Sequence, residues 1–284
     1  MSLVKVNELL QHATKNGYGV PAINTTNFET IRYAIEAAEL EKLPIIVQFF
    51  PGLGAYMDEE YVAHIAVDMA KKASVPVAVH LDHSASYEIA VRGIRDGFPS
   101  VMVDGSAKPF EENVEMTAAV ARVASVFDVD VEAELGHVGN AGNLEDYVNK
   151  DSYTNVEQAV EFVERTGCGS LAVAVGNAHG NYVRTPELAF DRIAELRDAL
   201  KVPLVMHGGS GIPDAQLQKA VQLGMSKFNI ATDYFAAMYR AFDETIENTG
   251  HNADGMALLA GVKDGMVNFV RSKLRLLNPN GFSL

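Results

Sequence analysis

The sequence predicts an α/β fold, a single closed (β/α)8 TIM barrel with an extra helix at the N-terminus and a helical extension at the C-terminus. Short apolar runs rich in β-branched residues recur along the chain, and longer segments with apolar residues three and four positions apart separate them. Near-continuous apolar strands joined by helices are typical of parallel strands buried on both faces. No long linker or Pro/Gly/Ser-rich break interrupts this alternation. We therefore expect residues 1–284 to form one catalytic domain rather than two domains.

Eight apolar runs fit the pattern of buried parallel strands. In chain order they are GVPAIN (19–24), PIIVQF (44–49), PVAVHL (76–81), SVMVD (100–104), VDVEAEL (129–135), SLAVAVG (170–176), PLVMH (203–207) and SKFNIA (226–231). The segments between them carry helical periodicity, clearest at 27–42, 58–73 and 109–127. The first seventeen residues predict a short helix that closes the bottom of the barrel, and residues 252–277 predict an additional C-terminal helix.

Composition excludes several classes of protein. With 48% hydrophobic and 21% charged residues, the chain has the composition of a globular domain rather than of a disordered, collagen-like or coiled-coil protein. Its 23 basic against 37 acidic residues give a net charge of −14, which disfavours binding to nucleic acid or to anionic membranes. The single cysteine, Cys168, rules out an internal disulfide. The sequence has no signal-like start and no apolar run of about 18 residues that could span a membrane, so we expect a cytoplasmic location.

Histidines stand at the ends of three predicted strands. His83 follows the third strand, His179 follows the sixth and His207 ends the seventh. Each of them alone fits a structural role, but active sites of this fold lie at the carboxyl ends of the strands, where the three side chains would meet. Three imidazoles with one open position are typical ligands of a catalytic zinc ion.

Acidic residues also occupy strand positions near the same rim. Glu132 and Glu134 are two residues apart, so both point into the barrel if Val131 and Leu135 pack outward. Buried acids of this kind need a cation or basic groups as partners, and for Glu132 a salt-bridged structural role is an equal alternative. Asp104 ends the fourth strand, where it could serve the site or simply cap a turn.

The segments HGGSG after the seventh strand and NIAT at the end of the eighth suggest a phosphate site. Glycines let backbone amides approach an anion closely, and the Ser210 and Thr232 hydroxyls can donate hydrogen bonds. Phosphate sites in (β/α)8 barrels commonly lie at these two loops.

The runs HLDHS, SVMVDGS, VEAELG, AHG, HGGSGIP and NIATD, in this order and spacing, resemble the class II, metal-dependent ketose-phosphate aldolases. The resemblance covers nearly the whole chain and is strongest to the group that includes the tagatose-bisphosphate, fructose-bisphosphate and phospho-dehydro-deoxygluconate aldolases. It implies that His83, His179 and His207 hold a catalytic Zn²⁺ and that Asp82 is the acid/base at the aldehyde oxygen. It further implies a second divalent metal site at Asp104 and Glu134, and assembly as a homodimer or homotetramer. The residues that it implies for binding dihydroxyacetone phosphate are Gly180, Gly208, Gly209, Ser210, Asn229, Ile230, Ala231 and Thr232.

Two departures from the family pattern leave parts of the site open. In the family, a glutamate in this loop moves the proton on the enediolate carbon, and an alignment without gaps puts Gly142 at its position. Glu145 could serve if the loop is three residues longer, and Asp146 is a weaker substitute. The arginine that grips a far phosphate in bisphosphate members is missing before the last helix. The aldehyde end then either lacks a phosphate or is held by Arg184 or Lys108.

Together these features predict an enzyme that reversibly cleaves a phosphorylated ketose to dihydroxyacetone phosphate and an aldehyde, with zinc as its cofactor. Lysine is absent from the carboxyl ends of the predicted strands, which argues against a Schiff-base aldolase. Two alternatives remain: a metal-dependent aldolase or lyase with an unphosphorylated ketone donor such as pyruvate, and a phosphosugar-binding barrel without catalytic activity.

Overall fold

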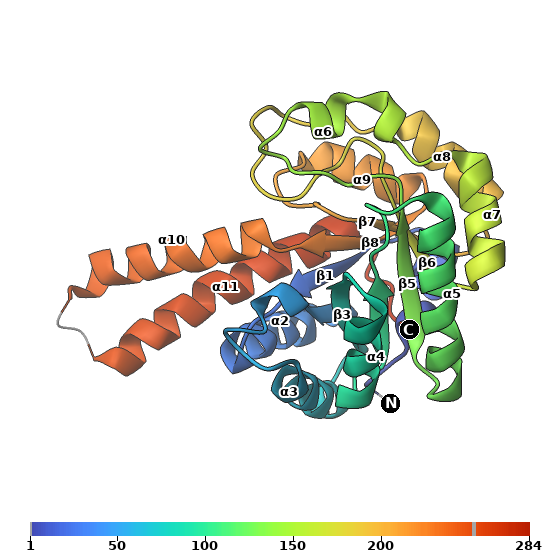
Figure 1. Cartoon of the computed structure of the whole chain (residues 1–284). Helices are drawn as coiled ribbons and strands as arrows, with labels where there is room; N and C mark the ends of the chain where they lie inside the picture. Colours follow the sequence, from blue (N-terminus) through green and yellow to red (C-terminus); the bar gives the residue numbers. More distant parts are fainter. Residues whose placement is uncertain (1, 252–253) are drawn as a thin grey trace.

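Eight parallel strands close into a barrel in sequence order, and β8 pairs back with β1 (Figure 1). The structure is a computed structural model that describes residues 2–251 and 254–284. All eight predicted strands are present, which confirms the predicted fold class. Their bounds are β1 Val20–Asn24, β2 Ile45–Phe49, β3 Val77–Ser84, β4 Ser100–Val103, β5 Asp130–Leu135, β6 Ser170–Val173, β7 Leu204–Met206 and β8 Met225–Ile230.

Helices surround the barrel, and some of them begin or end at capping residues that the sequence supplies. Asn27 forms a capping box with Thr30 at the start of α2, and Gly97 in the left-handed conformation ends α4. The helices are α1 Val6–Asn16, α2 Phe28–Glu41, α3 Glu59–Lys72, α4 Tyr87–Asp96, α5 Phe110–Val126, α6 Glu145–Val148, α7 Val156–Thr166, α8 Phe190–Ala199, α9 Asp214–Gln222, α10 Thr232–Thr249 and α11 Gly255–Leu277, with 3-10 turns η1 Pro51–Leu53 and η2 Lys150–Ser152.

The strands are buried on both faces, as their near-continuous apolar sequences predict. Every residue of β1, β2 and β8 is buried. At the amino ends of the strands, Leu9 and Leu10 of α1 pack on Val20, Ile46 and other inward-facing apolar residues. Helix α1 therefore closes the bottom of the barrel, and the opposite rim is left for a site.

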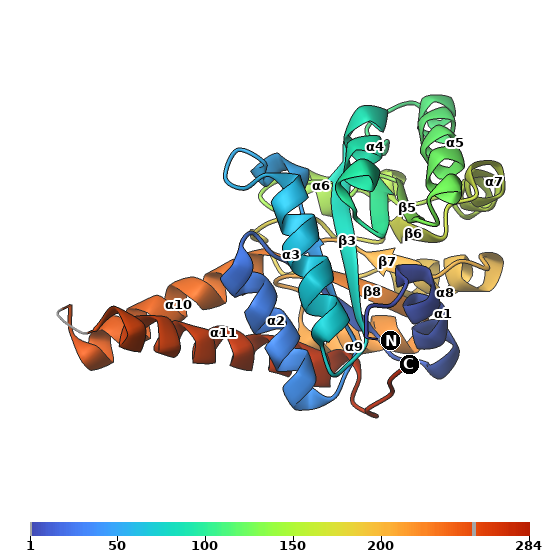
Figure 2. The ribbon, with the colours of Figure 1, turned by 90° about the horizontal axis from the view of Figure 1, so that it is seen from below.

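The last two helices form an arm that projects from the barrel (Figures 1 and 2). Helix α11 packs along α10 and against α2. The predicted C-terminal helix began at residue 252, but residues 252 and 253 lie outside the described part of the chain and α11 begins at Gly255. None of the helices in the described ranges has the length and apolar character needed to cross a bilayer.

Two strands differ from the prediction by three residues at their carboxyl ends, whereas the other six end within one residue of the predicted position. Strand β3 continues to Ser84, with a register shift against β4 between Leu81 and Ser84, and His83 within it has a φ of 47°. Strand β6 ends at Val173 instead of residue 176. It ends there because the next residue, Ala174, exchanges hydrogen bonds with Thr154 in the loop before α7.

Candidate active site

A cavity of about 850 Å³ opens at the carboxyl ends of the strands. This is the end of the barrel at which the sequence places the candidate residues. Its polar lining comes from strand ends and from the loops that follow them. The polar residues and glycines of the lining are Asn24, Asp82, His83, Asp104, Ser106, Lys108, Glu134, His137, His179, Gly180, Gly208, Ser210, Asn229 and Thr232.

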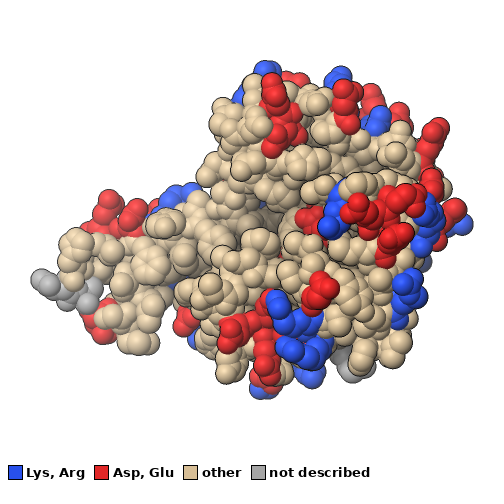
Figure 3. Space-filling view, in the orientation of Figure 1, with Lys and Arg blue, Asp and Glu red and all other residues tan. Residues whose placement is uncertain are grey.

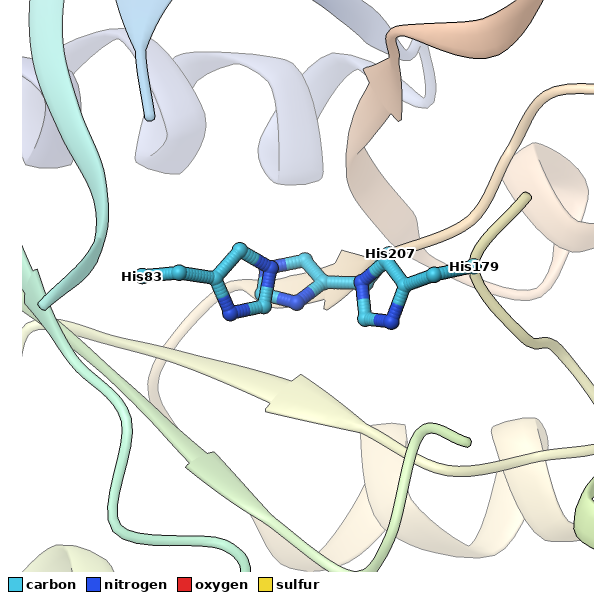
Figure 4. Close-up of side chains that lie close together, drawn as sticks. All are labelled: His83, His179 and His207. Atoms are coloured by element: carbon cyan, nitrogen blue, oxygen red, sulfur yellow. The ribbon is translucent and has the colours of Figure 1, made fainter. Parts of the chain in front are cut away.

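The three predicted histidine ligands meet at this cavity, which His83 and His179 line and beneath which His207 is fully buried. His83 comes from β3, His179 from the loop after β6, and His207 directly follows β7, and their rings converge from three sides (Figure 4). The ring centroids of His83 and His207 are 4.5 Å apart and those of His83 and His179 are 4.9 Å apart. One ring nitrogen of each lies within 4.8 Å of the others, which is close enough for one metal ion to bind all three.

Neighbouring groups fix the orientation of two of these rings. Nδ1 of His83 lies 2.8 Å from Oδ2 of Asp104, and Nδ1 of His179 lies 3.2 Å from the carbonyl oxygen of Val138. Contacts of this kind hold a metal-binding imidazole in one tautomer and one orientation.

Three buried polar atoms around the histidines suit a bound cation. Among the residues that the structure describes, Nε2 of His179, Nδ1 of His207 and Oε2 of Glu134 have no hydrogen-bond partner. Leaving such atoms unsatisfied inside a protein is costly, and a metal ion bound by them removes that cost. His83, Asp104 and Glu134 form a second group with the spacing of a metal site. The donor set therefore fits a divalent ion, and its imidazoles suit zinc.

The pKa values of His179 and His207 are shifted in opposite directions because the two rings have different charged neighbours. Burial, assisted by the positive charges of His83 and His207, lowers the pKa of His179 to about 4, so its ring is neutral at pH 7. Burial acts in the same direction on His207, but the carboxylates of Glu132 and Glu134 outweigh it and raise the pKa of His207 to about 10. The two carboxylates beside His207 therefore favour positive charge at this position.

Asp82 is held rigidly at the cavity wall by three side-chain amides. Asn24 and Gln48 donate hydrogen bonds to its Oδ2 at 2.9 and 3.1 Å, and Asn229 donates to its Oδ1 at 3.1 Å. Burial raises the pKa of this carboxyl, but His83 and Lys227 overcome that effect and lower it. The side chain is thus an oriented, ionised carboxylate, as a base acting on a substrate hydroxyl requires. Sequence reasoning missed Asn24 and Gln48, although both stand at or near the carboxyl end of a predicted strand.

Glu132 and Glu134 both point into the barrel, as their spacing predicts. The partner of Glu132 is Lys227 of β8, whose ammonium lies 2.9 and 2.8 Å from the two carboxylate oxygens. Lys227 is fully buried below the cavity. We missed it in the sequence, but it stands two residues before Asn229 and so shares that residue's inward face. His80 is also fully buried, and its Nδ1 lies 2.8 Å from the Ser100 hydroxyl.

The predicted phosphate residues lie together on the side of β7, β8 and α10. Gly208 has a φ of 60°, and a Cβ atom there would collide with the Ala178 carbonyl, so the close approach of these two loops requires glycine. The Ser210 hydroxyl accepts a hydrogen bond from the Asp233 amide at 3.1 Å, next to Thr232 at the start of α10. Of the eight predicted residues, Gly180, Gly208, Ser210, Asn229, Ala231 and Thr232 line the cavity, while Gly209 and Ile230 do not.

The residues proposed for proton transfer to the enediolate carbon, and those proposed for binding the aldehyde end, lie partly inside and partly outside the cavity. Glu145 begins α6, is exposed and does not line the cavity. Asp146 instead closes its own loop, accepting a hydrogen bond from the Asn140 amide at 2.8 Å. Lys108 and His137 line the cavity, whereas Arg184 is exposed outside it.

Comparison with known proteins agrees with this geometry. The family described as class-II fructose-bisphosphate aldolase matches residues 4–281. The D-tagatose-1,6-bisphosphate aldolase subunit GatY of Klebsiella oxytoca is 37% identical over 285 residues, covering 99% of each chain. YdjI of Escherichia coli K12 is 44% identical over 232 residues, which cover 82% of this chain and 84% of YdjI.

Solved structures give the same result. The crystal structure of the YdjI aldolase from E. coli K12 matches with a TM-score of 0.89 and 36% identity, covering 99% of this chain and all of the other. A putative fructose-1,6-bisphosphate aldolase from Coccidioides immitis matches with a TM-score of 0.85 and 29% identity, covering 98% and 97% of the two chains. With the barrel and the site already described, these similarities show that the chain belongs to the class-II fructose-bisphosphate aldolase family and is an aldolase, a carbon–carbon lyase.

Proposed function

We propose that this aldolase uses zinc to cleave a phosphorylated ketose reversibly into dihydroxyacetone phosphate and an aldehyde, with residues 1–284 acting as one catalytic domain. The observation that carries the proposal is the meeting of three imidazoles beside the cavity that Asp82 lines. Among the described residues, Nε2 of His179 and Nδ1 of His207 have no hydrogen-bond partner. The name of the relative GatY, a tagatose-bisphosphate aldolase subunit, supports a sugar phosphate as the substrate.

Cleavage of a carbon–carbon bond beside a ketone leaves an electron pair on the ketone fragment, and the site has groups for each step. Bound by His83, His179 and His207, zinc would supply positive charge beside the ketone oxygen, where negative charge develops. Asp82 takes the proton from the hydroxyl that becomes the aldehyde oxygen. As the bond breaks, its electron pair stays with the dihydroxyacetone phosphate fragment, and the aldehyde leaves. In synthesis Asp82 returns the same proton.

The fragment that keeps the electron pair must then gain a proton on carbon. Glu145 remains our prediction for this step, and its exposed position on α6 means that its loop has to close over the cavity to bring it to the substrate. His137 lines the cavity in the present conformation and lies at the start of that same loop.

Capture of an anionic substrate has to depend on local groups because the chain carries a net charge of −14. On the face that Figure 3 shows, most Lys and Arg side chains lie beside Asp or Glu rather than in one basic area. The N-terminus of α10 and the hydroxyls of Ser210 and Thr232 can attract a phosphate without a net positive field.

The direct test is detection of dihydroxyacetone phosphate released from a panel of ketose monophosphates and bisphosphates. Each substrate is assayed with the purified protein, with protein treated with a chelator, and with chelated protein resupplied with zinc. We expect release from at least one ketose phosphate, its loss on chelation and its recovery with zinc. Activity that chelation does not touch would contradict the role of zinc.

Replacing Ser210 by alanine distinguishes this function from an aldolase with an unphosphorylated donor. Loss of one hydroxyl hydrogen bond to a phosphate should raise the KM for dihydroxyacetone phosphate in the synthetic direction by about tenfold or more. The control is Ser125→Ala on the exposed end of α5, which should leave the KM unchanged. If the donor is instead an unphosphorylated ketone such as pyruvate, the KM for that donor should be the same in the two variants.

Replacing Lys108 by methionine tests whether the aldehyde end of the substrate carries an anion. Lys108 is exposed and follows β4, across the barrel from the phosphate residues. We expect the KM to rise by about fivefold for ketoses with a second anionic group and to stay constant for those without one, because exposed ion pairs contribute up to about 1 kcal/mol. Lys201→Met, at the turn before β7, is the matched control. An equal change for both kinds of ketose would assign Lys108 no part in selectivity.

We also propose that the enzyme works as a homodimer or homotetramer. Light scattering at assay concentrations measures this directly, and a mass of one chain would contradict it.

A further inference from the structure

A fully buried ionic cluster lies directly beneath the three histidines, and two of its members, Glu132 and Lys227, take no part in the steps proposed above. It consists of Glu132 on β5, Lys227 on β8 and the inner edge of His207 after β7, whose side chains are all 0% exposed. Strands β5 and β8 are not neighbours in the barrel, so the ammonium of Lys227 reaches Glu132 across the interior. Charged groups without solvent are stable only when they are paired and hydrogen-bonded, and this cluster meets that condition.

The imidazole of His207 lies between two carboxylates that contact it in different ways. Its Nε2 donates a hydrogen bond to Oε1 of Glu132 at 3.0 Å. Its Nδ1 lies 2.8 Å from Oε2 of Glu134, yet neither of these two atoms has a hydrogen-bond partner among the residues described. An imidazole that binds a metal ion through one nitrogen keeps its N–H on the other, so a proton on Nε2 leaves the lone pair of Nδ1 for the ion.

From this geometry we propose that Glu132 is a positioning residue that holds His207 in the Nε2–H tautomer and so presents Nδ1 to the metal ion. Lys227 compensates the charge of Glu132 and fixes its carboxylate in place. The inference rests on the proposed function, because it concerns the zinc that the three histidines would hold. The pairing of Lys227 with Glu132 also bears on the neighbouring group of His80, Asp82 and Glu132, which has the spacing of a metal site. The Lys227 ammonium already lies at the Glu132 carboxylate, so this carboxylate is not available to a metal ion.

Two double variants isolate the hydrogen bond from the charge pair. Glu132→Gln with Lys227→Met keeps an acceptor for the Nε2–H of His207, and Glu132→Leu with Lys227→Met removes it, while neither leaves a buried charge unpaired. Zinc affinity is measured for each by competition with a coloured chelator, without any substrate. We expect the Leu variant to bind zinc about 10- to 100-fold more weakly than the Gln variant, the usual cost of losing a group that orients a metal ligand.

A matched control separates this effect from a general loss of stability. Glu59 is also buried and pairs with a cation, Arg92 at 2.9 Å, but it lies on α3 and touches no metal-ligand histidine. Glu59→Gln should lower the melting temperature while its zinc affinity stays at the wild-type value. Equal zinc affinity of the two double variants, with both folded by circular dichroism, would overturn the proposal.

The wild-type protein provides a second readout that does not depend on the variants folding. In long-range ¹H–¹⁵N spectra of the zinc-loaded protein, His207 should show a protonated Nε2 and a metal-bound Nδ1, with its signals identified from their loss in His207→Gln. A zinc-bound Nε2 with a protonated Nδ1 would refute the proposed tautomer. If His207→Gln still binds zinc at full affinity, the proposed metal site itself fails; if it loses zinc but the double variants do not differ, only the positioning role fails.

Discussion

Asp82→Ala is expected to keep its zinc and to lose at least two orders of magnitude in turnover. In the proposed mechanism this carboxylate takes and returns the proton of the reacting hydroxyl, and loss of a positioned acid/base typically costs about 100- to 10,000-fold. The proposed zinc ligands are His83, His179 and His207, and Asp82 is not one of them, so the zinc content should be unchanged. The measurements are kcat with the best ketose phosphate of the panel and zinc by elemental analysis.

The effect should be specific to this carboxylate. Asp96 is also buried, at the end of α4, where it pairs with Arg95 instead of facing the cavity. Asp96→Ala should therefore change stability without changing kcat. Near-normal turnover of Asp82→Ala at full zinc content would refute the acid/base role.

His207→Ala is expected to lose both bound zinc and activity. Of the three histidines it is the most buried, and it lies between two carboxylates that favour a cation. Without its imidazole, only two of the three nitrogen ligands remain, so we expect less than one tenth of the wild-type zinc after dialysis. Elemental analysis of the dialysed protein gives the answer.

The control for this variant is an exposed histidine far from the cavity. His64 lies on the outer face of α3, and His64→Ala should retain the wild-type zinc content and kcat. A His207→Ala protein that keeps one zinc per chain would show that the ion is bound elsewhere.

Much of the fold could be predicted because barrel strands carry a strong local signal. Strands such as Ile45–Phe49 are buried on both faces, so almost every residue in them is apolar and the pattern needs no knowledge of neighbours. The ends are less predictable. Strand β6 ends early because Ala174 bonds to Thr154, a residue far away in sequence that no local pattern identifies.

The candidate site could be predicted where a residue's chemistry is unusual for its position, as with histidines at strand ends. Asn24 and Gln48 were missed because an amide is common in any loop, and only their contacts with Asp82 reveal what they do. Lys227 was missed because lysine was sought at the rim, whereas it lies one layer deeper, against Glu132. The position of Glu145 relative to the substrate could not be predicted, because it depends on the path of the loop that carries α6, which leaves Glu145 exposed and outside the cavity lining.

The left-handed backbone of His83 has a consequence for the order of residues in the chain. Successive side chains of a regular strand point to opposite sides of a sheet, so a proton-transfer group and a metal ligand next to each other in sequence could not both face one substrate. The φ of 47° and the shifted register at this point break that alternation, and Asp82 and His83 both line the cavity. The distance between the proposed acid/base, Asp82, and the proposed metal ligand, His83, is therefore set by a single peptide unit rather than by the packing of separate elements. It should persist through loop motions that rearrange the rest of the rim.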